Sequence, residues 1–512
     1  MNQAQFYLGH LASVRTATVA ASWLSTKRRH FVAATGFRVR VQPMTMSVQA
    51  GPRLVKVMRP AEMLENLADS GYVLVQQAVK DLNGAARRRA AGLILARLQQ
   101  IEERGEVPRS SISGMHGFCN DVEALAPGLR WQALLAARLA LEATLMSKRV
   151  LAADLVAHPE IAAEELESPI FIVGLPRTGS TLLHHLLSAD PDAQFLRTYE
   201  LMSPVRSVDM QYPTVQDKID RFLASIVVAI AKWKNPRWDD HHAVSAEAPE
   251  ECILAIQRDL PRDCMIAIEA VRKQENTPWL SPPSGSEAMA AYESYAGMLR
   301  HQQALRGTSG KHFVLKGQQV HLRHLEALQS AFPGARVIWT HRDPKDVVSS
   351  LCGMRQTQHE AVATAPADKQ RIGRHVLDTL AQAFTAGKAA MDKTQSVGNS
   401  GPEPVHVHYE GLVKDPIGVV EHLYSMWGLK VTPEHREAMK AYLKENEEER
   451  RQIQSRPSSK SGKAKPHFRQ YGITDAGLED TIMKELSNVF HAGEGVLAHK
   501  ELAARLGEQM AV

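Results

Sequence analysis

The clearest chemical signal in the sequence is a glycine-rich stretch, Gly174-Leu-Pro-Arg-Thr-Gly-Ser-Thr181. An apolar run at 169–173 precedes it and the helical pattern TLLHHLLSA follows it, which is the context of a phosphate-binding loop. Successive backbone N–H groups at the start of a helix attract an anion there. The stretch therefore predicts a site for a phosphate or sulfate group.

The side chains of this loop refine the prediction. Thr178, Ser180 and Thr181 add hydroxyl donors, and Ser180 stands where a nucleoside triphosphatase has lysine. Arg177 supplies a cation instead, and a guanidinium can hold two oxygens of a phosphate or sulfate at once. The missing lysine, together with the lack of an evident strand-end Asp for magnesium, argues against nucleoside-triphosphate hydrolysis. A turn that only reverses the chain is the structural alternative.

A second basic position follows a later apolar run, in ARVIWTHRDPKDVVSSL. Arg342 lies at the carboxyl end of this expected strand, and Ser350 follows eight residues later, about two helical turns along the next helix. Taken alone, Arg342 and Asp343 are equally compatible with a helix cap and Ser350 with a surface position.

Together, GLPRTGSTLLHHLL and VIWTHRDPKDVVSS resemble the two donor motifs of the sulfotransferase superfamily. The resemblance covers roughly 130–480, and the RTGST version and the KPHFRQYG tail look like the bacterial-type branch. It implies 3′-phosphoadenosine-5′-phosphosulfate (PAPS) as co-substrate and no metal. The residues it places at the 5′-phosphosulfate are Arg177, Thr178, Gly179, Ser180 and Thr181, and those it places at the 3′-phosphate are Arg342 and Ser350.

Sulfuryl transfer also needs charge stabilisation and a base for the acceptor hydroxyl. We expect Arg177 and Lys316 to stabilise the bridging and leaving oxygens. Glu200 is the favoured base, because it resembles a glutamate near the acceptor in branches with an arginine-containing loop. His242 is included among the catalytic candidates. The other candidate bases are His241, Glu247, Glu250 and His321.

The elements that must position these residues read as an α/β fold, a P-loop-type parallel sheet flanked by helices. Strands are expected at 169–173, 312–316, 335–340 and 404–409, each followed by a helix. A helical cap insertion at about 205–310 is expected over the sheet. The expected organisation is a basic extension at 1–60, a helical N-terminal region at 61–167 and the sulfotransferase-like domain at 168–512. A mobile loop is expected at 444–472.

Composition narrows the function further. The 512 residues are 44% hydrophobic and 23% charged, as in ordinary globular proteins. Nine of the 61 Lys and Arg residues precede Glu62, the first acidic residue, so 52 basic and 56 acidic residues remain. The body of the chain is therefore not a basic nucleic-acid binder. The acid-free opening is typical of an organellar transit peptide, or else of a disordered extension.

Four cysteines without CxxC spacing and no span-length apolar segment complete the picture. We expect a soluble intracellular enzyme, with organellar import as one reading of its N-terminus, that sulfates a small molecule, lipid or glycan by in-line displacement. A non-catalytic nucleotide-binding protein and a P-loop kinase using ATP are the alternatives. The apolar run 223–231 suits a greasy acceptor, although core packing explains it more simply.

Overall fold

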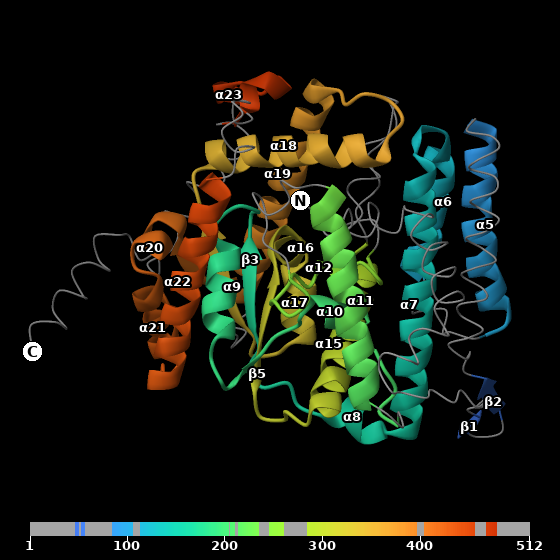
Figure 1. The fold of residues 1–512 in the computed structure, drawn as a ribbon, viewed down its shortest axis with the longest axis horizontal. Helices are drawn as coiled ribbons and strands as arrows, with labels where there is room; N and C mark the ends of the chain where they lie inside the picture. The colour runs from blue at the N-terminus through green and yellow to red at the C-terminus, as the bar shows by residue number, and fades with distance from the viewer. Residues whose placement is uncertain are drawn as a thin grey trace, which may run out of the picture.

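The computed structural model describes residues 47–50, 53–56, 84–105, 113–203, 205–209, 213–234, 245–260, 284–396, 404–455 and 467–478. A parallel five-stranded sheet lies at the centre of the described chain (Figure 1), in the order β4-β5-β3-β6-β7. Its strands are β3 (Ile170–Gly174), β4 (Ala193–Gln194), β5 (His312–Gly317), β6 (Arg336–His341) and β7 (Val405–His408). The expected α/β class is confirmed, and β4 is a strand that the sequence did not predict.

Alternate residues of the strands build two cores, because both faces of a parallel sheet are buried. On one face, Ile170 and Ile172 pack with residues of α9 (Ser180–Ser188), α21 (Pro416–Met426) and α22 (Pro433–Ser455). On the other face, Phe171 and Val173 join a larger cluster. Its helices are α15 (Gly285–Arg306), α16 (Gln318–Arg323), α17 (Leu325–Ala331), α18 (Pro344–Val362) and α19 (Lys369–Ser396).

The strand order puts a topological switch point at the carboxyl ends of β3 and β6. From β3 the chain runs through α9 to β4, toward one edge of the sheet. From β6 it runs through α18 and α19 to β7, at the opposite edge. Ligands of open parallel sheets bind where neighbouring strands send their connections in opposite directions. The topology therefore brings the loop after β3 and Arg342 after β6 to one place.

The described chain before the sheet contains helices and one hairpin. The helices are α5 (Gly84–Glu103), α6 (Ser113–Leu125), α7 (Trp131–Ala157) and α8 (Pro159–Ala163), with a short 3₁₀ turn, η2 (Ala126–Gly128). The strands β1 (Ser47–Ala50) and β2 (Arg53–Lys56) pair as the hairpin. The core of α5–α7 includes Val362 and Ala363, at the end of α18. The domain boundaries themselves remain a prediction.

Helices also occupy the expected cap. The expected range 205–310 contains α11 (Pro213–Lys234), α12 (Ile253–Ile256) and α15, and α10 (Thr198–Met202) lies just before it. The apolar run 223–231 lies on α11 and has two faces, since Ala224 and Val228 are buried whereas Leu223 is 52% exposed and Ile226 39%. No helix in the described part of the chain is long and apolar enough to cross a membrane.

The expectation of a mobile loop from residue 444 is wrong for its first part. Helix α22 continues to Ser455, since the run KENEEERR consists mostly of good helix formers. Beyond it, residues 467–478 contain η3 (Phe468–Tyr471) and α23 (Asp475–Leu478). The remaining described helix, α20 (Tyr409–Lys414), directly follows β7.

Candidate active site

The loop between β3 and α9 has a tightly constrained backbone. Gly174 has a φ of 128°, and a Cβ there would lie 2.5 Å from the backbone oxygen of Thr340. Gly179 has a φ of 84°, and a Cβ there would lie 2.9 Å from Tyr409 Cδ2. Arg177 adopts a φ of 72°, which is costly for a residue with a side chain and is concentrated at functional sites. The loop is thus pressed between β6 and α20.

The hydroxyl of Thr178 fastens this loop to the sheet. Thr178 Oγ1 lies 2.8 Å from the backbone oxygen of Leu175, to which it donates, and 2.6 Å from Thr340 Oγ1. Thr178 is 1% exposed. The hydroxyl of Thr178, which we expected to bind an anion directly, therefore stabilises the loop. Thr178 would contact a ligand through its backbone N–H.

The first two residues of α9 meet side chains from β5 and α16. Lys316 Nζ donates to Thr181 Oγ1 at 3.1 Å, and Gln318 Nε2 donates to Ser180 Oγ at 2.8 Å. A carboxylate completes the group, since Glu251 Oε1 lies 3.2 Å from Lys316 Nζ and 3.0 Å from Gln318 Nε2. Lys316 is fully buried. The structure thus brings Lys316 to Thr181 at the start of α9, and its role at the leaving oxygens stays a prediction.

The two arginines of the predicted donor site also converge. Arg342 Nη1 donates to the backbone oxygen of Arg177 at 3.2 Å, and its guanidinium carbon lies 4.2 Å from the ring centre of Tyr409. Burial, and then the nearby charge of Arg342, lowers the pKa of Arg177. Two like charges held this close form a site that favours an anion between or beside them.

Ser350 lies on the second turn of α18 and is half-buried. Its neighbour Ser349 accepts a hydrogen bond from the backbone N–H of Phe468 at 3.3 Å. Segment 467–478 therefore packs against α18 beside Ser350. The contact of Ser350 with a 3′-phosphate stays a prediction.

Glu200 lies in a different environment from Lys316. Its Oε2 accepts from the backbone N–H of Arg197 at 2.8 Å, which closes a capping box on α10, and lies 2.8 Å from Arg306 Nη2. Its Oε1 lies 3.5 Å from Arg197 Nη1. With only 5% of its side chain exposed, Glu200 has both oxygens occupied, and its role as base stays a prediction.

The histidine candidates divide into buried and undescribed ones. His321 is fully buried, its Nδ1 lies 2.8 Å from the hydroxyl of Tyr292, and burial lowers its pKa to about 3. A neutral, enclosed imidazole of this kind supports the packing below Gly317, where a Cβ would lie 2.3 Å from its ring. His241 and His242 lie outside the described residues.

Among the described residues, no group of three or more His, Cys, Asp or Glu side chains could hold a metal ion. The nearest approach to such a cluster is a stack of His341, His406 and His408 at the ends of β6 and β7. Burial lowers the pKa of each of them. The stack packs on Trp339, which supports a structural role.

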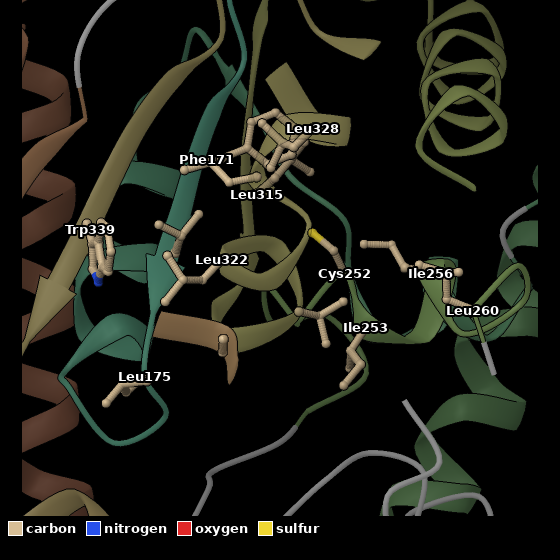
Figure 2. Close-up of a cluster of buried hydrophobic side chains, with 14 of the residues drawn as sticks. Phe171, Leu175, Cys252, Ile253, Ile256, Leu260, Leu315, Leu322, Leu328 and Trp339 are labelled. Atoms are coloured by element: carbon tan, nitrogen blue, oxygen red, sulfur yellow. The ribbon is translucent and has the colours of Figure 1, made fainter. Parts of the chain in front are cut away.

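The sequence analysis missed three residues of this site: Glu251, Gln318 and Tyr409. Each reaches the loop 174–181 from a distant segment, so local spacing carries no signal for it. Gln318 and Tyr409 directly follow the strands β5 and β7, and this position at the carboxyl end of a strand was the signal that could have identified them. Figure 2 shows the residues that follow Glu251 in the chain: Cys252, Ile253 and Ile256 belong to the same buried cluster as Leu175 and Leu322.

Comparisons with known proteins agree with this geometry. A family model described as "Sulfotransferase family" matches residues 169–433. Among solved structures, the sulfotransferase STF1 from Mycobacterium tuberculosis H37Rv is similar, with a TM-score of 0.56 and 22% identity over 77% of this chain and 98% of that one. The sulfotransferase STF9 from Mycobacterium avium has the same TM-score and identity, over 78% and 95%.

A search of curated proteins gives no match. The two solved structures support the fold, and the family match spans more than half of the chain, including the loop after β3, Lys316 and Arg342. The resemblance in the two motifs is thereby confirmed, and the chain belongs to the sulfotransferase family.

Proposed function

We propose that this protein transfers a sulfuryl group from PAPS to a hydroxyl of a small molecule, lipid or glycan. The observation that carries the proposal is the convergence of Arg177 and Arg342 at the carboxyl ends of β3 and β6. A donor with phosphate groups on both sides of one ribose needs two cationic positions close together. A triphosphate needs only the loop and its lysine.

The residues present fit such a donor. The Nε of Arg342 is buried and has no hydrogen-bond partner in the part of the chain that the structure describes, and a charged donor of this kind is well suited to a phosphate oxygen. Glycine at 174 and 179 lets the loop pack directly against Thr340 and Tyr409, which would hold its backbone N–H groups in place for an anion. Arg177 to Thr181 would hold the 5′ side, and Arg342 with Ser350 would hold the 3′-phosphate.

When bound, PAPS would supply the sulfuryl group, and the protein would supply position and charge. In-line attack by the acceptor oxygen passes through a loose transition state, by analogy with phosphoryl transfer. Lys316 would stabilise the negative charge that develops on the leaving phosphate, because it already bonds Thr181 at the start of α9. Arg177 and the loop N–H groups would act on the same oxygens.

The test uses Arg342→Ala and two nucleotides, adenosine 3′,5′-bisphosphate and adenosine 5′-monophosphate, with binding measured by calorimetry. A charge-assisted hydrogen bond contributes about 1.5–3 kcal/mol, so affinity for the bisphosphate should fall about 10- to 150-fold. Affinity for the monophosphate should change little. Lys345→Ala is the matched control, because Lys345 is an exposed cation on the first turn of α18, three residues after Arg342, and pairs with Asp475.

Equal losses for both nucleotides would refute the assignment of Arg342 to the 3′-phosphate. Tighter binding of ATP with magnesium than of the bisphosphate would favour the kinase alternative. Bisphosphate binding without transfer to any acceptor in a cell extract supplied with labelled PAPS would favour the non-catalytic alternative.

A further inference from the structure

The backbone on both sides of Glu251 is fixed. The N–H of Glu250 donates to the backbone oxygen of Leu196 at 3.0 Å, and the N–H of Cys252 donates to that of Lys316 at 2.7 Å. Cys252 is fully buried. Glu251 is therefore held at the carboxyl end of β5, and its position does not depend on a free loop.

The two carboxylate oxygens of Glu251 have different environments. Oε1 meets both Lys316 Nζ at 3.2 Å and Gln318 Nε2 at 3.0 Å. Oε2 has no hydrogen-bond partner among the described residues, and the side chain is 22% exposed. One oxygen is thus anchored beside the donor loop while the other is open to solvent.

Glu200 and Glu250 lack such an open oxygen. Both oxygens of Glu200 are engaged by Arg197 and Arg306. Glu250 is 2% exposed and accepts from the backbone N–H of Glu251 at 2.9 Å. Glu251 is also close enough to Arg177 for its charge to raise the pKa of that guanidinium, against the larger effect of burial.

We propose that Glu251 is the base that accepts the proton of the acceptor hydroxyl. The assignment rests on the proposed function. As the acceptor oxygen bonds to sulfur, its proton passes to Oε2 of Glu251, and the bond from sulfur to the bridging phosphate oxygen breaks. Adenosine 3′,5′-bisphosphate leaves with that electron pair, and the exposed carboxylic acid then returns its proton to solvent.

Lys316 and Gln318 have a second task in this arrangement. By holding Oε1, they fix the direction in which Oε2 points, and a base must be held within hydrogen-bond reach of the proton that it takes. Gln318 connects the two halves of the site, because the same amide nitrogen donates to Ser180 Oγ and to Glu251. It adopts a φ of 43°, a strained backbone for a residue with a side chain.

The experiment compares wild type and Glu251→Gln with three acceptors for the sulfuryl group of PAPS. Benzyl alcohol and water must lose a proton during transfer. 4-Nitrophenol is largely ionised at an assay pH of about 8.5, so it has no proton for a base to remove. Transfer to water is followed as hydrolysis of PAPS, which needs no fit to an acceptor pocket. The matched control is Glu437→Gln, which removes an exposed carboxylate that bonds Lys440 on α22.

General-base catalysis contributes about 10²- to 10⁴-fold. Glu251→Gln should therefore slow transfer to benzyl alcohol and water by at least about 100-fold, and transfer to the nitrophenolate much less. Adenosine 3′,5′-bisphosphate should bind the variant as it binds wild type, which also shows that the variant is folded. Glu437→Gln should change none of these rates.

An equal loss with all three acceptors would overturn the assignment, because Glu251 would then act only by positioning Lys316. An unchanged rate of PAPS hydrolysis would overturn it as well. Failure of wild type to bind adenosine 3′,5′-bisphosphate is a different result, since it would remove the proposed function itself.

Discussion

The ion pair between Lys316 and Glu251 allows a quantitative test of the site without any ligand. Lys316 is fully buried, whereas the side chain of Glu251 is 22% exposed. Breaking a buried pair from one side costs about 3–5 kcal/mol, because it leaves a charge uncompensated. Here the exposure of Glu251 and the remaining bond from Lys316 to Thr181 reduce that cost.

We therefore expect Glu251→Gln to lower the free energy of unfolding by about 2 kcal/mol, because the buried ammonium loses its counter-charge. Lys316→Met should cost about 1–2 kcal/mol, since the carboxylate it leaves behind can reach water. The double variant should be more stable than the sum of these losses predicts, by about 1–2 kcal/mol.

The assay is urea unfolding of the four proteins at one pH, followed by tryptophan fluorescence, to which the buried Trp339 of β6 contributes. Asp392→Asn on α19 is the control for Glu251→Gln, because its carboxylate is 62% exposed and pairs with Lys388. Single effects that add to within about 0.5 kcal/mol would refute the coupling.

Two further predictions concern stability. Gly174→Ala should destabilise the protein by about 3–5 kcal/mol, because the added Cβ meets the backbone of Thr340 and the φ of 128° is strained for alanine. Gly411→Ala, which meets nothing within 4 Å, should be tolerated, and urea midpoints separate the two outcomes. The free energy of unfolding should also fall as the pH drops below about 6.5, because buried neutral histidines bind protons in the unfolded chain before they do so in the folded one. The contribution of these histidines to the fall should level off at about pH 3–4. Burial lowers the pKa to about 3 in His321, about 3 in His375 and about 4 in His406. Each contributes about 1.4 kcal/mol per pH unit, so urea midpoints that stay constant from pH 7 to pH 5 would contradict this.

Local patterns predicted the parts of the fold that local forces determine. The four strands at 169–173, 312–316, 335–340 and 404–409 are visible as apolar runs, and the structure has β3, β5, β6 and β7 there. The two-residue strand β4 has no such run, because it exists only through pairing with β5. The charge run at 444–455 indicates a solvated loop, but Lys, Glu and Arg are also good helix formers, and the structure has the end of α22 there.

The candidate site divides in the same way. Arg177 and Lys316 stand at strand ends, so parallel topology alone brings them near each other. Glu251 lies just before α12, and only the backbone bond from Cys252 to Lys316 and the buried residues that follow place it beside Lys316. The contacts that occupy Glu200 are equally invisible in the sequence, since Arg306 is more than a hundred residues away.

Helix α18 has a consequence for how this protein can be shortened. Its 19 residues span about 28 Å, at about 1.5 Å per residue, and it begins just after Arg342 and ends at Val362. At that far end Arg130 donates to the backbone oxygen of Ala363 at 2.7 Å, and Figure 1 shows α18 running toward α6 and α7. A truncation that starts at the sheet would expose the apolar residues Val362 and Ala363 at the end of α18. The other end of this helix directly follows Arg342. Helices α5–α7 therefore stabilise the far end of α18, and a shortened protein needs to keep them.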